Sequence, residues 1–135
     1  MTMKNKAHLL ILFFCLITLP IQAQNQNATF KQMKEAFSAS DYTKLSALFS
    51  DSVDLTVRNT DGIYSKTQAK GVLKSFFESN TPKSFQVKHQ GSSNDGTVYA
   101  IGLYVSAKAS YRVYALLKNL DGNWKIVQLQ IEDEL

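Results

Sequence analysis

The stretch from Tyr64 to Asn80 constrains the fold more than any other part of the chain. Its apolar residues recur at helical spacing: Ala69, Val72, Leu73, Phe76 and Phe77. Ser65 and Gln68 have the spacing of a capping box, and Pro82 follows the stretch, where a helix cannot continue. Burying four large side chains contributes roughly 6–12 kcal/mol, which is comparable to the whole net stability of a small domain, about 5–15 kcal/mol. The stretch therefore predicts a long helix that covers a hydrophobic core.

Residues 1–23 have the pattern of a secretory signal peptide. Lys4 and Lys6 precede an apolar run from Leu9 to Leu19, and Ala23 is a small residue at the expected cleavage site. The run is shorter than the ~20 residues that a membrane-spanning helix needs. We therefore expect an exported protein, periplasmic or secreted, with no stable membrane insertion once the signal peptide is removed.

The rest of the chain, residues 24–135, has the size of one small domain. The whole chain has 15 Lys or Arg and 11 Asp or Glu residues, a net charge of +4, which falls to about +2 without Lys4 and Lys6. A charge this close to neutral gives little support to nucleic-acid binding, and we expect none. The only cysteine, Cys15, lies in the predicted signal peptide, so the domain depends on its apolar core rather than on disulfides.

The remaining segments predict an α+β domain with helices on one face of a curved sheet. A first helix is expected at 27–39, and a short second helix follows the N-cap residue Asp41. A strand at 53–57 and a turn at 59–62 precede the long helix. After Pro82 the apolar period changes to two, which predicts an antiparallel meander of four strands at about 84–91, 97–106, 110–119 and 124–132. The expected order is α-α-β-α-β-β-β-β.

Two segments of the chain resemble the NTF2-like superfamily, which includes cystatin-like, SnoaL-type and ketosteroid-isomerase-type domains. They are FSASDYTKLSALFSDSVDL at 37–55 and DGNWKI at 121–126. The chain is also similar to a bacterial exported family of unknown function within that superfamily, through HQGSS at 89–93, YRVY at 111–114 and QLQIE at 128–132. The resemblance implies an NTF2-like cone, a strongly curved antiparallel sheet wrapped around the long helix, with a pocket inside and frequent dimers. It implies no activity, since the superfamily contains enzymes and non-enzymes.

The sequence offers no complete set of catalytic residues. In the steroid-isomerase branch an Asp general base follows the stretch that matches Leu48–Asp51, and Val57 stands at that position here. Valine cannot abstract a proton. His89 is the only histidine after the predicted signal peptide, and one histidine without a cysteine is a poor basis for a transition-metal site. We predict no metal site and no cofactor.

The predicted strands have two apolar faces. Taking Asp121-Gly122 as a two-residue hairpin turn sets Tyr114 opposite Leu129 and Ala115 opposite Gln128. One face then carries Tyr99, Ile101, Leu103, Val105, Arg112, Tyr114, Leu116, Val127, Leu129 and Ile131. Because these side chains are large, we assign that face to the helices. The other face carries Ala100, Gly102, Tyr104, Val113, Ala115, Leu117, Trp124, Ile126, Gln128 and Gln130, with Val87 and His89. It is too apolar to face water, and either a second subunit packed against it or an open binding face would explain this.

Two functions follow from this arrangement. The first is an exported, non-catalytic module that binds a small apolar ligand or a protein partner. It is expected to form a homodimer whose interface contains His89, Tyr104, Ala115, Ile126 and Gln128. The alternative is a small pocket enzyme of SnoaL or ketosteroid-isomerase type that lacks the usual Asp base. Its pocket would contain Tyr99, Arg112 and Tyr114, with Arg112 holding an anionic group of the substrate. The missing base favours the first function.

Overall fold

The structure of the chain, a computed structural model, describes residues 26–135. Its helices are α2 (Gln26–Ser38), α3 (Tyr42–Ala47) and α4 (Lys66–Ser79). Its strands are β1 (Phe49–Val57), β2 (Thr60–Ser65), β3 (Pro82–Ser92), β4 (Val98–Ser106), β5 (Ser110–Leu120) and β6 (Asn123–Asp133). They form a six-stranded sheet in the order β2-β1-β6-β5-β4-β3. The pairs are antiparallel except β1 and β6, which run parallel. The predicted signal peptide lies outside the described residues.

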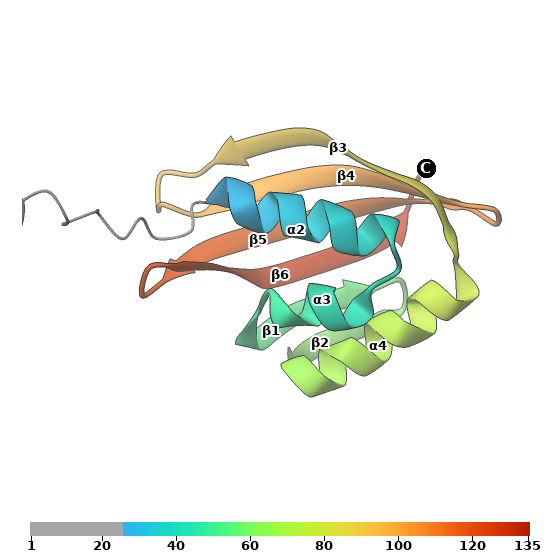
Figure 1. The fold of residues 1–135 in the computed structure, drawn as a ribbon, viewed down its shortest axis with the longest axis horizontal. Helices are drawn as coiled ribbons and strands as arrows, with labels where there is room; N and C mark the ends of the chain where they lie inside the picture. The colour runs from blue at the N-terminus through green and yellow to red at the C-terminus, as the bar shows by residue number, and fades with distance from the viewer. Residues whose placement is uncertain (1–25) are drawn as a thin grey trace, which may run out of the picture.

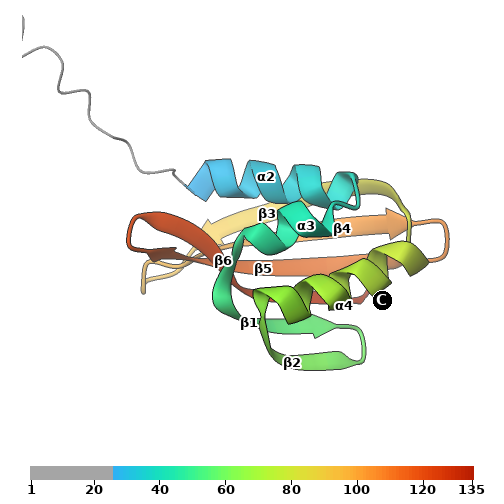
Figure 2. The same ribbon diagram turned by 60° about the horizontal axis from the view of Figure 1, so that its bottom comes forward.

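The three helices lie on one face of the sheet, as expected for this α+β class (Figure 1, Figure 2). Helix α2 lies over β3 and β4, whereas α4 lies over β1 and β2 and also contacts α3. We call the face toward the helices the inner face and the opposite face the outer face. No element among residues 26–135 covers the outer face.

All three helices lie where the sequence predicts them. At the start of α4, Ser65 Oγ accepts a hydrogen bond from Gln68 N at 3.2 Å, and Gln68 Oε1 accepts one from Ser65 N at 3.1 Å, which completes the capping box. Asp41 caps α3 by accepting a hydrogen bond from Lys44 N at 2.9 Å. The apolar stripe of α4 is buried at Ala69, Leu73, Phe76 and Phe77. Helix α4 therefore covers a core, as expected.

Strand β2 differs from the sequence prediction, which places a turn at 59–62. The turn consists of Arg58 and Asn59, and the chain pairs again with β1 from Thr60 onward. Asp61 and Gly62 disfavour a strand by local propensity, and only alternate residues of β2 are even partly buried. Pairing with β1 at the edge of the sheet, rather than local propensity, therefore determines that this segment is a strand. The observed order is α-α-β-β-α-β-β-β-β.

The β5–β6 hairpin is paired as predicted near its turn and is shifted by one residue farther along. Leu117 pairs with Ile126, which is the register that a two-residue turn at Asp121-Gly122 predicts. Beyond that point the observed pairs are Tyr114 with Gln130 and Ala115 with Leu129. The shift is a β-bulge, in which β6 has one extra residue opposite β5. The bulge allows Ile126 and Leu129, which are three residues apart, to be fully buried on the same face.

The inner face is the one with small side chains, which corrects our assignment of the faces. Three residues of the predicted dimer interface have no exposed surface, namely Tyr104, Ala115 and Ile126. The helices and β3 supply the missing volume: Phe37 stacks on Phe85 with ring centroids 4.6 Å apart, and a Cβ at Gly102 would lie 2.8 Å from the Phe85 ring. The hollow expected to receive a second subunit is therefore filled by aromatic side chains of the same chain.

Candidate functional site

Tyr99, Arg112 and Tyr114, predicted to line an interior pocket, lie on the outer face instead. Their positions alternate with the buried residues of β4 and β5. The rings of Tyr99 and Tyr114 are 6.3 Å apart and nearly parallel, so the structure brings these two residues together. Arg112 is exposed and pairs with Leu103 on β4 and with Glu132 on β6. The interior placement is wrong for the same reason as the face assignment: residue size in the strands does not identify the core side.

His89 joins the two tyrosines from β3. Its Nε2 lies 3.2 Å from Tyr99 Oη, within hydrogen-bond distance. Tyr99 pairs with Gly91, and a Cβ at Gly91 would lie 2.5 Å from Tyr99 Oη. Glycine therefore allows the tyrosine ring to lie across β3. Gln128 also lies on the outer face, where its Nε2 donates to Asp54 Oδ2 at 3.4 Å. Of the predicted interface residues, only His89 and Gln128 are thus on an open surface.

The outer face carries a continuous apolar strip along β4 and β5. It consists of six half-buried side chains, Tyr99, Ile101, Leu103, Val105, Tyr114 and Leu116, which we call the outer patch. Polar residues border it on the neighbouring strands: Gln86 and His89 on β3, and Gln128 and Gln130 on β6. An apolar centre with a polar rim is the usual anatomy of a protein–protein contact surface.

Aromatic rings fill the inner side of the sheet beneath α4. The Phe76 ring lies 5.0 Å from the Tyr111 ring and 5.4 Å from the Tyr104 ring. Within residues 26–135, every buried side-chain nitrogen and oxygen has a hydrogen-bond partner. Burial raises the pKa of Tyr104 to about 12, and its hydroxyl donates to Asn80 O. Tyr104 is therefore a protonated structural donor at neutral pH and cannot serve as a base.

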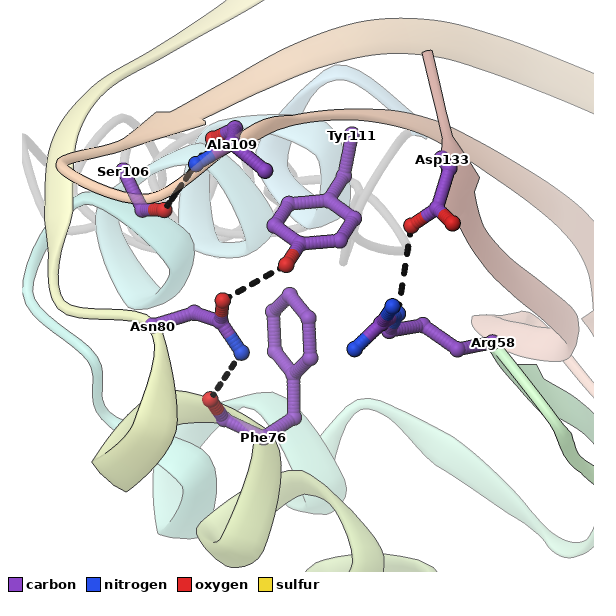
Figure 3. Close-up of polar contacts among 7 residues, drawn as sticks. All are labelled: Arg58, Phe76, Asn80, Ser106, Ala109, Tyr111 and Asp133. Carbon is purple, nitrogen blue, oxygen red and sulfur yellow. Dashed lines mark hydrogen bonds and ion pairs between the residues drawn. The ribbon is translucent and has the colours of Figure 1, made fainter.

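Asn80 connects the end of α4 to β4 and β5. Its Oδ1 accepts a hydrogen bond from Tyr111 Oη at 2.6 Å, and its Nδ2 donates to Phe76 O at 3.1 Å (Figure 3). Its carbonyl accepts the bond from Tyr104. The sequence indicates only the helix end at Asn80, because its two tyrosine partners are distant in the chain.

Arg58 lies beside this network, at the turn between β1 and β2. Its backbone is in the left-handed region, with φ at 54°. Its Nε donates to Asp133 Oδ1 at 3.1 Å, and its Cζ lies 5.8 Å from the centroid of the Tyr111 ring. Figure 3 shows the guanidinium directed toward Phe76. The sequence does not single out Arg58, because only the pairing of β1 with β6 places it near Tyr111 and Asp133.

The described part of the chain shows neither a cluster of metal-binding side chains nor a helix that could span a membrane. Residues 26–135 contain no group of three or more His, Cys, Asp or Glu side chains placed to hold a metal ion. None of the helices in this range has the length and apolar character needed to cross a membrane.

Several solved structures are similar to this one. A DUF4783 family protein from Bacteroides fragilis YCH46 has a TM-score of 0.71 at 23% identity, over 76% of this chain and 96% of that chain. A DUF4783 family protein from Bacteroides uniformis ATCC 8492 has a TM-score of 0.72 at 27% identity, over 78% and 96%. A domain of unknown function with a cystatin-like fold from Nostoc punctiforme PCC 73102 has a TM-score of 0.66 at 15% identity, over 87% and 80%.

Sequence comparison agrees with the structural similarity. A comparison with curated proteins finds no match. Residues 30–132 match the family described as "Domain of unknown function (DUF4783)". The chain therefore belongs to the DUF4783 family, a domain of unknown function with the cystatin-like, NTF2-like fold that its sequence resembles.

Proposed function

We propose that this domain is an exported, non-catalytic binding module that forms a homodimer through the outer patch. The observation that carries the proposal is the patch itself: six large apolar or tyrosine side chains on a sheet face that no described element covers. Exposed apolar surfaces with polar rims mark sites of association. The proposal keeps the dimer expected from the sequence but moves its interface to the opposite face of the sheet.

The charges around the patch favour a second copy of the chain as the partner. A two-fold interface places the same surface of both subunits face to face, so a patch with charges of one sign would repel itself. Arg112 and Glu132, which carry opposite charges, are direct neighbours at one end of the patch. In a symmetric dimer each Arg112 can therefore meet the Glu132 of the other subunit.

A pocket enzyme is not proposed. That alternative needs Tyr99, Arg112 and Tyr114 to line an enclosed pocket, and these residues lie on the open face of the sheet. Val57 occupies the position that the superfamily's general base would take, and a valine side chain has no proton acceptor.

Sedimentation velocity on the parent and two variants tests the dimer. At about 10–100 μM, where an interface of micromolar affinity is populated, we expect the parent to sediment as a dimer. Ile101→Glu places two charges in the centre of the interface, so we expect a monomer that keeps the far-UV circular dichroism of the parent. Thr43→Glu makes the same charge change on the exposed side of α3 and is expected to leave the dimer intact. A monomeric parent, or a dimeric Ile101→Glu variant, would show that the outer patch is not this interface.

The proposal of export rests on Lys4, Lys6 and the apolar run from Leu9 to Leu19. Intact mass of the protein from a secreting bacterial host is expected to show the loss of about 23 residues. An unprocessed chain that stays in the cytoplasm would contradict export without affecting the dimer.

A further inference from the structure

An open cavity of about 630 Å³ lies between α4 and the β1–β2 turn. It is separate from the outer patch, with which it shares no residue. Its apolar wall consists of Val57, Val72 and Phe76, and its polar margin includes Arg58, Gln68, Ser75 and Ser79. The volume is within the range of small-molecule binding sites, about 300–1,000 Å³. This cavity therefore has the size and the mixed lining of a ligand site.

Arg58 presents unused hydrogen-bond donors beside this cavity. Of its nitrogens, only Nε is bonded to Asp133; the two terminal nitrogens make no hydrogen bond with any other residue between 26 and 135. The Arg58 and Asp133 side chains are 48% and 61% exposed, so the ion pair between them is weak and can be exchanged. The terminal nitrogens of a guanidinium form the planar pair of donors that binds a carboxylate with two parallel hydrogen bonds.

The turn does not explain why an arginine stands at position 58. The left-handed backbone conformation of this residue is unfavourable for arginine, whereas Asn or Gly adopts it readily in a two-residue hairpin turn. The position is nevertheless firmly held, because Arg58 N donates to Ile131 O at 2.8 Å and the guanidinium lies near the Tyr111 ring. A charged side chain is thus fixed at the cavity at the expense of local backbone preference.

Gly71 is a second residue whose identity is not explained by the stability of the local structure. It lies inside α4, where glycine is less favourable than alanine. Apart from its chain neighbours and the nearby backbone of α4, a Cβ added at Gly71 would have nothing within 4 Å, so packing against other parts of the chain does not require a glycine there. Gly71 lines the cavity next to Val72 and leaves this part of its wall open. Departures from local preference tend to lie at functional sites, and both of these departures border this cavity.

We infer that this cavity binds a small organic carboxylate with an apolar body. The carboxylate would pair with Arg58, and the apolar body would lie against half-buried Val72 and the small exposed edge of Phe76. Arg58 is the only basic residue among those that line the cavity, which matches a single negative charge better than a phosphate dianion. The inference does not depend on the proposed dimer, because the cavity and the outer patch lie on different parts of the molecule.

Titrations followed by ¹H–¹⁵N correlation spectra test the inference with three probes. Phenylacetate carries both the charge and an apolar body, phenylacetamide lacks the charge, and acetate lacks the body. We expect phenylacetate to give saturable shifts at the amides of Arg58, Gly71 and Val72. Phenylacetamide and acetate are each expected to bind at least about tenfold more weakly, since each lacks one of the two contacts.

Variants assign the binding to particular residues. Arg58→Asn removes the charge with a residue that adopts the turn conformation, and we expect it to weaken phenylacetate binding at least about tenfold. Gly71→Leu fills the cavity and is expected to do the same. If Gly71→Leu does not fold, Ser75→Met at an exposed position of the same wall replaces it. Arg112→Asn, which removes an exposed arginine on the outer face, is the control and is expected to leave the Kd within about twofold.

Three results would overturn the inference. The first is the absence of saturable shifts up to about 20 mM phenylacetate, because even a ligand with a Kd in the millimolar range would occupy the site at that concentration. The second is equal binding of phenylacetamide, which would exclude recognition of the charge. The third is an unchanged Kd in a folded Arg58→Asn variant, which would place the ligand elsewhere.

Discussion

The two faces of the sheet combine large and small side chains in opposite ways. On the inner face the strands contribute small residues such as Ala100, Gly102 and Ala115, and aromatic rings from the helices and from β3 fill the space above them. On the outer face the strands contribute large residues such as Tyr99, Ile101 and Leu116, and nothing in residues 26–135 lies above them. Close packing depends on the summed volume of both layers, so large strand residues do not by themselves mark the core side.

The largest expected difference between the faces concerns two neighbouring residues of β5. Ala115→Glu buries a carboxylate beneath the helices, and we expect it to unfold the domain, with a loss above about 5 kcal/mol. Leu116→Glu places the same group on the outer face, where a loss of about 1 kcal/mol or less is expected in the monomer. Far-UV circular dichroism and the dispersion of amide proton shifts distinguish these outcomes. A folded Ala115→Glu variant would mean that the inner face is not the core.

Truncation of apolar side chains gives a second comparison of the faces. Phe76 packs against Tyr104 and Tyr111 and is nearly inaccessible, so Phe76→Ala should reduce the free energy of unfolding by about 3–5 kcal/mol. Leu103→Ala, on the outer face, should reduce it by about 1 kcal/mol in the monomer, because less area is buried there. Urea unfolding measures both losses as shifts of the midpoint, provided that the m-value is unchanged in the variants. Equal losses at the two positions would contradict the assignment of the faces.

The buried hydroxyl of Tyr104 predicts a loss of stability at high pH. Burial raises its pKa from 10.0 to about 12 in the folded domain, so the unfolded chain releases this proton first as the pH rises. The stabilisation is complete below about pH 10 and is lost progressively toward about pH 12, with a total effect of about 3 kcal/mol at most. Urea unfolding between pH 8 and pH 12, approximately, should show a smaller decline for Tyr104→Phe than for the parent. Parallel curves for the two proteins would show that Tyr104 is not responsible.

The smallest effects are expected at two glycines with different surroundings. Gly71→Ala in α4 should stabilise the domain by about 0.5–1 kcal/mol, because a Cβ there meets no side chain or backbone from outside its own helix turn and alanine favours a helix. Gly102→Ala on the inner face should destabilise it, because the Cβ would lie 2.8 Å from Phe85 and 3.0 Å from Gln86 O. Thermal unfolding measures both, with opposite shifts in Tm expected. A lower Tm for Gly71→Ala would indicate an unrecognised packing role for that glycine.

The features predicted correctly from the sequence depend on residues that are close in the chain. The capping box of α4 requires only Ser65 and Gln68, and the hairpin turn at Asp121-Gly122 is specified by its own two residues. The alternation along β4 and β5 likewise identifies two faces without long-range information.

The features that differ from the prediction depend on partners that are distant in the chain. Strand β2 forms against local propensity because β1 pairs with it. The bulge in β6 and the choice of inner face depend on how the helix aromatics fit above the strands. Arg58 reaches Asp133 across 75 positions of sequence, so no short motif can indicate the cavity that Arg58 borders.

The position of β6 has a consequence for the order of folding. This strand is the last of the six described strands in sequence order but lies in the middle of the sheet, where it joins the β1–β2 hairpin to β5, β4 and β3. During synthesis on a ribosome, the earlier strands have no shared partner until residues 123–133 emerge. Sheets that depend on such distant contacts form slowly, since the closure of a long loop precedes any gain from pairing. Pulse-labelling hydrogen exchange is expected to show β1 protected only together with β6, so the completed sheet appears in one late step.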